Sequence, residues 1–412
     1  MQLREVLNLT RLGWGLAVPV LLLCTAGVLC IHATDRPTER DAPVVEQDEG
    51  GLALEGWLPA ALERVGPRTM RHLVYLLTGA ALMFLTLSVP YQKIGRASYA
   101  AYGVTIVLLL ALLADHVVDL PLIAPRKGAR RWIDLGLFAV QPGEFMKLAL
   151  TMTLARYLRF RSSYREWRGL LTPFALTLGP MVLIVLQPNL GTTLMMLPLL
   201  FAMLFVAGAR LRHLALIVLL GLATLPLFYF YGMRDYQRTR VLAVVRQYTA
   251  AGAGQSDEGF QLRQAKIALG TGGLTGTGYG AGPFIQYDLL PEEHNDFIFA
   301  IIGHQWGFVG SLVVLLAYAL IVVFGIEVAM VTNDPYGRLL AIGICAMIVV
   351  QALLNIGMTI GLAPITGMTL PFVSAGGSSL WTNFIGLGLL VNIAQRRPLL
   401  IARPPFEFED AT

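Results

Sequence analysis

The chain has 412 residues, of which 56% are hydrophobic and only 14% are charged. A water-soluble domain could not cover its surface with so few charges, so most of the chain is expected to lie in a bilayer. The formal net charge of +5 does not indicate nucleic-acid binding, because the basic residues occupy short loops between apolar runs rather than one continuous face.

Crossing about 30 Å of hydrocarbon takes roughly 20 apolar residues, and about ten such runs are predicted. We expect them at 12–31, 71–90, 98–118, 143–160, 171–187, 189–208, 213–231, 297–328, 337–361 and 378–395. The eighth run is too long for one straight crossing and is expected to be tilted or broken. The predicted fold class is therefore all-α and polytopic, with residues 1–412 forming a single membrane domain.

The basic residues predict which loops face the cytoplasm. If the N-terminus is inside, the inward loops hold Lys93, Arg96, Arg159, Arg161, Arg165, Arg168, Arg210, Arg212, Arg338, Arg396 and Arg397. The positive-inside rule is then satisfied with both termini in the cytoplasm. The chain is accordingly predicted to be a multi-pass protein of the cytoplasmic membrane.

Two long segments are predicted outside the membrane, at 32–70 and 232–296. In the first, an acidic polar stretch precedes apolar residues that share one helical face over 54–65, which predicts a short interfacial helix for anchoring or partner docking. The second lies between the seventh and eighth spans and contains the glycine-rich run 270–280. No Walker lysine follows this run, so it is interpreted as a loop that bends beside lipid or sugar rather than a nucleotide-binding loop.

A basic cluster before the fourth span defies the positive-inside rule. Its members are Arg126, Lys127, Arg130 and Arg131. Arginine grips phosphate oxygens bidentately, so the cluster could bind an anionic headgroup. Pairing with local acids or with membrane lipids is the equally weighted alternative.

Acidic residues meet the start of the eighth span in the segment 289–303. A carboxylate at a membrane boundary costs several kcal/mol unless it is paired or used, which makes Asp296 a functional candidate. Capping of the following helix explains it equally well from this segment alone.

The same segment resembles the P-E-x-H-T-D-F-I-F signature of the shape, elongation, division and sporulation (SEDS) family, which includes RodA and FtsW. Further motifs of that family are matched in order by 127–133 (KGARRWI), 141–147 (QPGEFMK), 187–191 (QPNLG), 355–358 (NIGM), 364–367 (PITG) and 371–379 (PFVSAGGSS). The resemblance covers roughly 70–397, and its methionine and Thr-Gly forms favour the RodA branch.

The resemblance implies a peptidoglycan glycosyltransferase that joins lipid II disaccharides at the outer face of the cytoplasmic membrane. The product would serve cell-wall elongation and shape, or division. It implies Asp296 as the essential acid, acting as general base on the acceptor sugar hydroxyl. A class B penicillin-binding protein would be the partner, and a divalent cation, Mg²⁺ or Mn²⁺, could assist the pyrophosphate leaving group. The candidate substrate-binding residues are Lys127, Arg130, Arg131, Glu144, Lys147, His294, Ser374, Ser378 and Ser379.

Two of these candidate groups have structural alternatives. Glu144 and Lys147 lie three apart on one helical face, where a structural ion pair is slightly favoured over catalysis. The serines that open the last span, Ser374, Ser378 and Ser379, could bind phosphate or sugar, or serve capping and close packing.

The chain departs from the family pattern at Asn189 and Ala375, where the family has aspartate and tyrosine, and at His304 and Gln305, where it usually has two glutamates. If the lost acids position a metal or a substrate hydroxyl, catalysis is expected to be slower or its pH optimum shifted. A lipid II flippase and a non-catalytic scaffold that activates a penicillin-binding protein are the competing interpretations.

Overall fold

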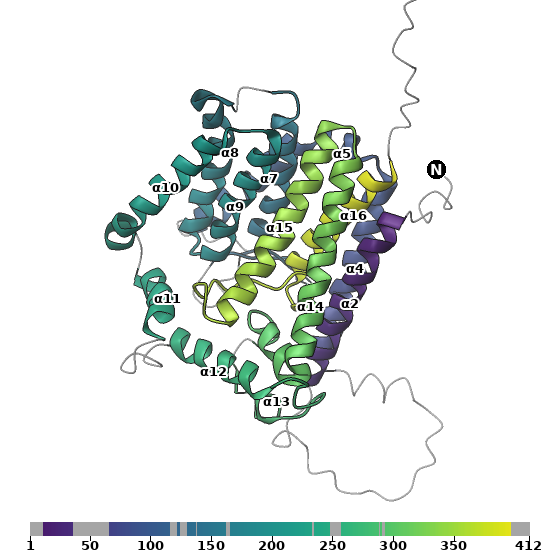
Figure 1. The fold of residues 1–412 in the computed structure, drawn as a ribbon, viewed down its shortest axis with the longest axis vertical. Helices are drawn as coiled ribbons and strands as arrows, with labels where there is room; N and C mark the ends of the chain where they lie inside the picture. Colours follow the sequence, from purple (N-terminus) through teal and green to yellow (C-terminus); the bar gives the residue numbers. More distant parts are fainter. Residues whose placement is uncertain are drawn as a thin grey trace, which may run out of the picture.

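The computed structural model describes residues 11–35, 66–115, 122–123, 130–136, 138–161, 165–232, 235–247, 257–287, 289–290 and 293–396. Long helices run side by side through most of the molecule and form one bundle (Figure 1). Their bounds are α2 Arg11–Thr34, α4 Pro67–Ser88, α6 Ser98–Ala114, α7 Pro142–Leu158, α8 Trp167–Leu186, α9 Leu190–Ala207, α10 Leu211–Leu227, α14 Ile298–Val331, α15 Pro335–Thr359 and α16 Gly377–Gln395. A helix therefore overlaps each of the ten predicted spans, which confirms the all-α prediction.

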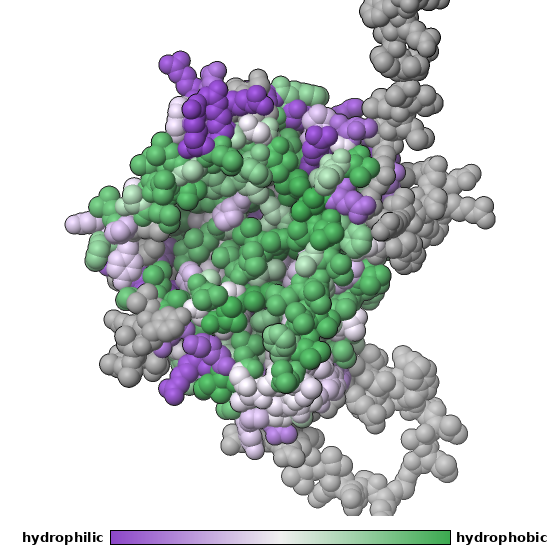
Figure 2. Space-filling view, viewed as in Figure 1, coloured by the Kyte–Doolittle hydropathy of each residue, from purple (hydrophilic) through white to green (hydrophobic). Residues whose placement is uncertain are grey.

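Length and hydropathy support membrane spanning for most of these helices. Seven of the described helices are long and apolar enough to cross a bilayer. Helices α6 and α10 are apolar but shorter, and α7 carries Glu144, Lys147 and Arg156. Hydrophobic side chains cover the middle of the face in Figure 2, whereas hydrophilic ones gather toward its two ends. The chain is thus a multi-pass membrane protein, while the count of ten crossings and the cytoplasmic termini stay predictions.

The remaining described elements are short. They are α5 Tyr91–Arg96, the π-helical turn Phe228–Gly232 that continues α10, α11 Asp235–Arg246, α12 Asp257–Thr271 and α13 Pro283–Gln286, with β1 Ile133–Asp134 and β2 Ala139–Val140 pairing as an antiparallel hairpin. Helices α11, α12 and α13 lie at one end of the bundle (Figure 1), where the segment 232–296 was predicted. The predicted interfacial helix at 54–65 lies outside the described residues.

Helix α15 occupies the centre of the bundle and contacts α7, α9 and α14 (Figure 1). It begins where Asp334 accepts a hydrogen bond from the amide of Tyr336 at 3.1 Å and Pro335 takes the first helical position. Both residues favour a helix start, because the N–H groups of the first turn have no partner within the helix. Asp334 accepts from one of them, and proline has no N–H to leave unpaired. Helix α16 packs along α4, and α2 packs along α14.

Helix α14 is broken at Gly307, which has φ 63° and ψ −157°. The break confirms the expectation drawn from its length. In an unbroken helix the carbonyls of residues 304 and 305 would accept from the amides of 308 and 309. Here the glycine-rich segment inserts between them and hydrogen-bonds both carbonyls and both amides. The bonds are Thr277 N to His304 O (2.9 Å), Gly278 N to Gln305 O (3.1 Å), Phe308 N to Gly273 O (2.9 Å) and Val309 N to Leu274 O (3.1 Å).

This insertion gives the glycine-rich run a structural reason that the sequence did not predict. A Cβ at Gly276 would lie 2.0 Å from the carbonyl oxygen of Gln305, so backbone packs directly on backbone there. Irregular backbone at membrane depth is tolerated only where its polar groups are satisfied, and the segment satisfies them. The glycines therefore let the segment come close enough to hydrogen-bond the backbone groups that the break leaves free.

We expect Gly276→Ala to lower the thermal unfolding temperature of the detergent-purified protein far more than Gly278→Ala. Both positions have positive φ, +86° and +101°, so both substitutions carry a backbone penalty of about 1–2 kcal/mol. Only position 276 adds the clash with Gln305, since the nearest atom to a Cβ at 278 is Ala281 Cβ at 3.8 Å. Equal unfolding temperatures for the two variants would contradict the role of close backbone approach.

Candidate active site

Asp296 ends a turn of residues 293–296 that leads directly into α14. Its side chain is half-buried. Asp296 immediately precedes Phe297, the N-cap residue of α14, so helix capping stays the alternative interpretation. A Cβ at Gly367 would lie 3.4 Å from Asp296 Oδ2, which shows that the loop between α15 and α16 passes beside the carboxylate.

That loop and α15 hold the turn through its backbone. Asn355 of α15 donates to the carbonyl of Asp296 at 2.8 Å, and the Ser374 hydroxyl donates to the carbonyl of Asn295 at 2.6 Å. The amide of Ala375 donates to the carbonyl of His294 at 3.1 Å. His294 is half-buried in the same turn, so the structure brings it together with Asp296 and Ser374.

A buried polar network lies next to this turn. Lys147 Nζ lies 2.6 Å from Glu144 Oε2 and donates to Gln351 Oε1 at 3.0 Å. The Gln351 amide donates in turn to the carbonyl of Thr369 at 2.9 Å and to Ser379 Oγ at 3.0 Å. Lys147 is only 1% exposed, so its charge depends on these partners. The ion pair predicted from the i,i+3 spacing is present.

Helix α15 connects the network to Asp296. Gln351 and Asn355 are four residues apart, so they share one face of the helix. Gln351 contacts the Glu144–Lys147 pair, and Asn355 contacts the turn of Asp296. The ion pair and the turn of the candidate acid therefore contact consecutive turns of α15.

The first serine of α16 binds the β-hairpin rather than another helix. Ser378 Oγ accepts from the amide of Gln141 at 2.9 Å and donates to the carbonyl of Ala139 at 3.2 Å. These bonds place the hairpin over the start of α16. The predicted phosphate or sugar contacts of Ser378 and Ser379 stay predictions.

The described members of the basic cluster contact protein groups. Arg130 forms a salt bridge with Asp115 at 2.7 Å, and Asp115 is 2% exposed at its side chain. Arg131 donates to the carbonyl of Gln187 at 2.9 Å and to that of Pro188. Pairing with a local acid, one of the two alternatives, is thus present for Arg130. Lys127 lies outside the described residues.

Two departures from the family pattern have structural roles. Asn189 caps α9 by accepting from the amide of Thr192 at 3.3 Å. Ala375 contributes its backbone amide to the turn of Asp296, which any residue except proline could do.

The other two departures lie further along α14, beside the glycine-rich segment. His304 is fully buried, with Nδ1 2.9 Å from the Thr271 hydroxyl, and Gln305 is fully buried next to it. Their effect on rate or pH optimum stays a prediction.

A divalent cation would need ligands from the substrate. Within the described ranges no three His, Cys, Asp or Glu side chains gather as a metal site. Mg²⁺ commonly binds one or two carboxylates together with substrate phosphates. Asp296 fits as one such carboxylate only if pyrophosphate oxygens complete the set.

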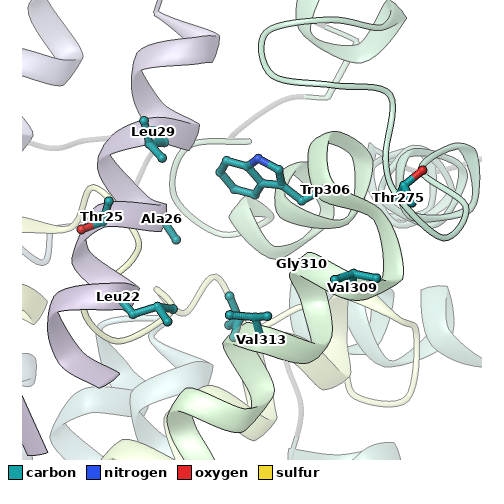
Figure 3. A pocket seen from close by; sticks show the side chains of 10 residues that line it. Leu22, Thr25, Ala26, Leu29, Thr275, Trp306, Val309, Gly310 and Val313 are labelled. Atoms are coloured by element: carbon teal, nitrogen blue, oxygen red, sulfur yellow. The ribbon is translucent and has the colours of Figure 1, made fainter. Parts of the chain in front are cut away.

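An apolar groove of about 580 Å³ lies between α2 and α14. Its lining residues are Leu22, Thr25, Ala26, Leu29, Thr275, Trp306, Val309, Gly310, Val313 and Val314. Trp306 and Val313 of α14 face Leu22 and Leu29 of α2 across it (Figure 3). None of its lining residues belongs to the turn of Asp296 or to the polar network beside it, so the groove is described separately from that site.

Sequence reasoning missed Asn355, Gln351 and Thr369 as site residues. The first stands inside a quoted motif, and the second lies one turn before it in an apolar run. Uncharged amides in membrane helices usually hydrogen-bond across helices, and this could have marked both positions. Their partners could not be predicted, because they lie on separate segments.

Comparison with known proteins identifies the family of this chain. The FtsW, RodA and SpoVE family of cell cycle proteins matches residues 63–398. The stage V sporulation protein E of Bacillus subtilis is 35% identical over 332 residues, covering 79% of this chain and 86% of that protein. The peptidoglycan glycosyltransferase MrdB of Escherichia coli is 33% identical over 332 residues, covering 80% and 86%. The probable peptidoglycan glycosyltransferase FtsW of Geobacter metallireducens is 36% identical over 330 residues, covering 79% and 84%.

Solved structures agree with these relatives. A chain of a peptidoglycan synthase complex that coordinates polymerization and crosslinking superposes with a TM-score of 0.72 at 28% identity, covering 95% of this chain and 99% of that one. The rod shape determining protein RodA of Thermus thermophilus gives 0.64 at 28% identity, covering 95% and 98%. Relatives of all three kinds match with similar identity, so the preference for the RodA branch stays a prediction. This chain belongs to the FtsW, RodA and SpoVE family, as its motifs predicted.

Proposed function

We propose that this chain is a peptidoglycan glycosyltransferase that joins lipid II disaccharides at the outer face of the cytoplasmic membrane. Curated relatives that share a third of its sequence are named for this activity, which favours an enzyme over a flippase or a scaffold. The observation that carries the site assignment is Asp296, a half-buried carboxylate on a turn whose carbonyls at 294, 295 and 296 are held by neighbouring segments.

In the proposed reaction, Asp296 accepts the proton of the acceptor's sugar hydroxyl while that oxygen attacks the anomeric carbon of the donor. A new C–O glycosidic bond forms, and the bond between the anomeric carbon and the pyrophosphate oxygen breaks. Polyprenyl pyrophosphate leaves with the electron pair. Its growing negative charge would be stabilised by the cations of the basic cluster, Lys127, Arg130 and Arg131.

Two further parts of the proposal concern what the chain binds. Asp296 would be the residue of this chain that holds a divalent cation, and the cation would supply electrostatic stabilisation of the leaving group. A class B penicillin-binding protein would be the partner that cross-links the product. The match to a chain of a peptidoglycan synthase complex supports an assembly of this kind.

The test supplies purified protein and its partner with lipid II and follows the length of the glycan product. Polymer that depends on this chain is the expected result. Movement of lipid II across a vesicle membrane without polymer would favour a flippase. Polymer that persists at full rate with the Asp296→Ala chain would remove Asp296 from the mechanism.

A further inference from the structure

The three carbonyls of residues 294, 295 and 296 each accept a hydrogen bond from a different group on the opposite side of the site. The donors are the Ala375 amide, the Ser374 hydroxyl and the Asn355 amide, at 3.1, 2.6 and 2.8 Å. We call these three groups the carbonyl clamp. A turn held at three successive peptide units cannot rotate without breaking at least one of these bonds.

The clamp is itself fixed in the protein interior. The Ser374 hydroxyl accepts from the amide of Leu370 at 2.7 Å, and the Asn355 side-chain amide also donates to the carbonyl of Met368 at 2.6 Å. Asn355 is 0% and Ser374 is 1% exposed. Each side chain makes two hydrogen bonds to backbone groups, and turning either one away would leave those buried groups unpaired.

From this geometry we infer that Asn355 and Ser374 are positioning residues that hold the Asp296 carboxylate at the place where it accepts the substrate proton. The inference rests on the proposed function of Asp296. A general base must lie within hydrogen-bond reach of its proton, and a fixed backbone leaves only the side-chain torsions of Asp296 to adjust. The Ser374 hydroxyl donates its proton to the turn, which supports positioning rather than the substrate contact predicted from its place before α16.

The bundle contains a matched control for Asn355. Asn392 of α16 is also 0% exposed, and its side-chain amide also donates to two carbonyls, those of Thr86 and Val89, both at 2.6 Å. It lies 15 residues beyond the start of α16, about 22 Å along the helix from the site. Removing the side-chain amide of Asn355 or of Asn392 leaves two carbonyls without a donor. Asn392→Ala also removes the acceptor of the Tyr91 amide at 3.3 Å, so it disturbs the fold at least as much, but only Asn355 contacts the turn of Asp296.

The experiment measures kcat and KM for lipid II with the full-length chain, per folded molecule, beside thermal unfolding in detergent. We expect Asn355→Ala and Ser374→Ala to lower kcat by about 10- to 100-fold with KM changed less than about threefold. Asn392→Ala should lower the unfolding temperature as Asn355→Ala does and keep kcat within about twofold of the wild-type value. The double variant Asn355→Ala/Ser374→Ala should lose less than the product of the two single losses, because both act on one turn.

Wild-type kcat in both single variants, with Asp296→Ala inactive, would overturn the positioning role and leave the proposed function intact. An equal loss of kcat in Asn392→Ala would also overturn it, because the effect would then be general to buried amides. If Asn355→Ala does not fold, Ser374→Ala against Asn392→Ala decides the same question. Full activity of Asp296→Ala would instead overturn the proposed function.

Discussion

Asp296→Asn is expected to lower the rate of glycan polymerisation by about 10²–10⁴-fold while the protein stays folded. The substitution keeps the size and most of the hydrogen-bonding capacity of the side chain. It removes the basic oxygen, since an amide cannot accept the proton of an attacking hydroxyl at neutral pH. The measurement is the initial rate of polymer formation from lipid II, with thermal unfolding in detergent as the test of folding.

Asp334→Asn is the matched control for this substitution. Asp334 is also a half-buried aspartate beside a helix start, at the far end of α14, where it accepts from the amide of Tyr336 at 3.1 Å and the hydroxyl of Tyr91 at 3.0 Å. Asparagine retains an oxygen acceptor there, so the rate should stay near that of the wild type. A wild-type rate in Asp296→Asn, or an equal loss in both variants, would show that the carboxylate at 296 is not the base.

Lys147→Met is expected to destabilise the folded protein by about 3–5 kcal/mol, the usual effect of removing one member of a buried ion pair. The Glu144 carboxylate would keep its place in the bundle and lose the ammonium at 2.6 Å, and Gln351 Oε1 would lose its donor at 3.0 Å. Thermal or denaturant unfolding of the detergent-purified protein measures the change. An unfolding midpoint equal to that of the wild type would contradict the dependence of Glu144 on this partner.

The double variant Glu144→Gln/Lys147→Met separates stability from substrate binding. Neutralising both groups removes the unpaired charge, so much of the lost stability should return. If the pair serves structure alone, polymerisation should return with it. A stable double variant that makes no polymer would instead support the predicted contact between these residues and substrate.

The membrane helices could be predicted from the sequence because a bilayer imposes a minimum apolar length on each span. The break in α14 was also predictable, since an apolar run of its length exceeds one crossing. Asp296 became a candidate because charge at the edge of an apolar run is costly without a role, but helix capping explained it equally well until the family motifs were matched. Each of these signals is local in the chain.

The contacts that fix the site are long-range, so the partners of these residues could not be predicted. Arg130 pairs with Asp115, and Asn355 hydrogen-bonds to the carbonyl of Asp296. These pairs come together only when the helices pack into the bundle. Composition predicted a charged cluster at 126–131 but not which of its members contact protein groups. The glycines of 270–280 were interpreted as a loop that bends beside lipid or sugar, whereas in the structure they pack against the backbone of α14.

The hydrogen bonds across the break in α14 limit how this chain can be recombined with its relatives. Four backbone groups of the helix bond to a segment that begins about 30 residues earlier, so neither piece satisfies its hydrogen bonds alone. A chimera with a junction between 278 and 304 would combine the glycine-rich segment of one protein with the α14 of another. Exchange of 270–310 as one block keeps donors and acceptors together, so this block is the unit to transplant with the first turns of α14.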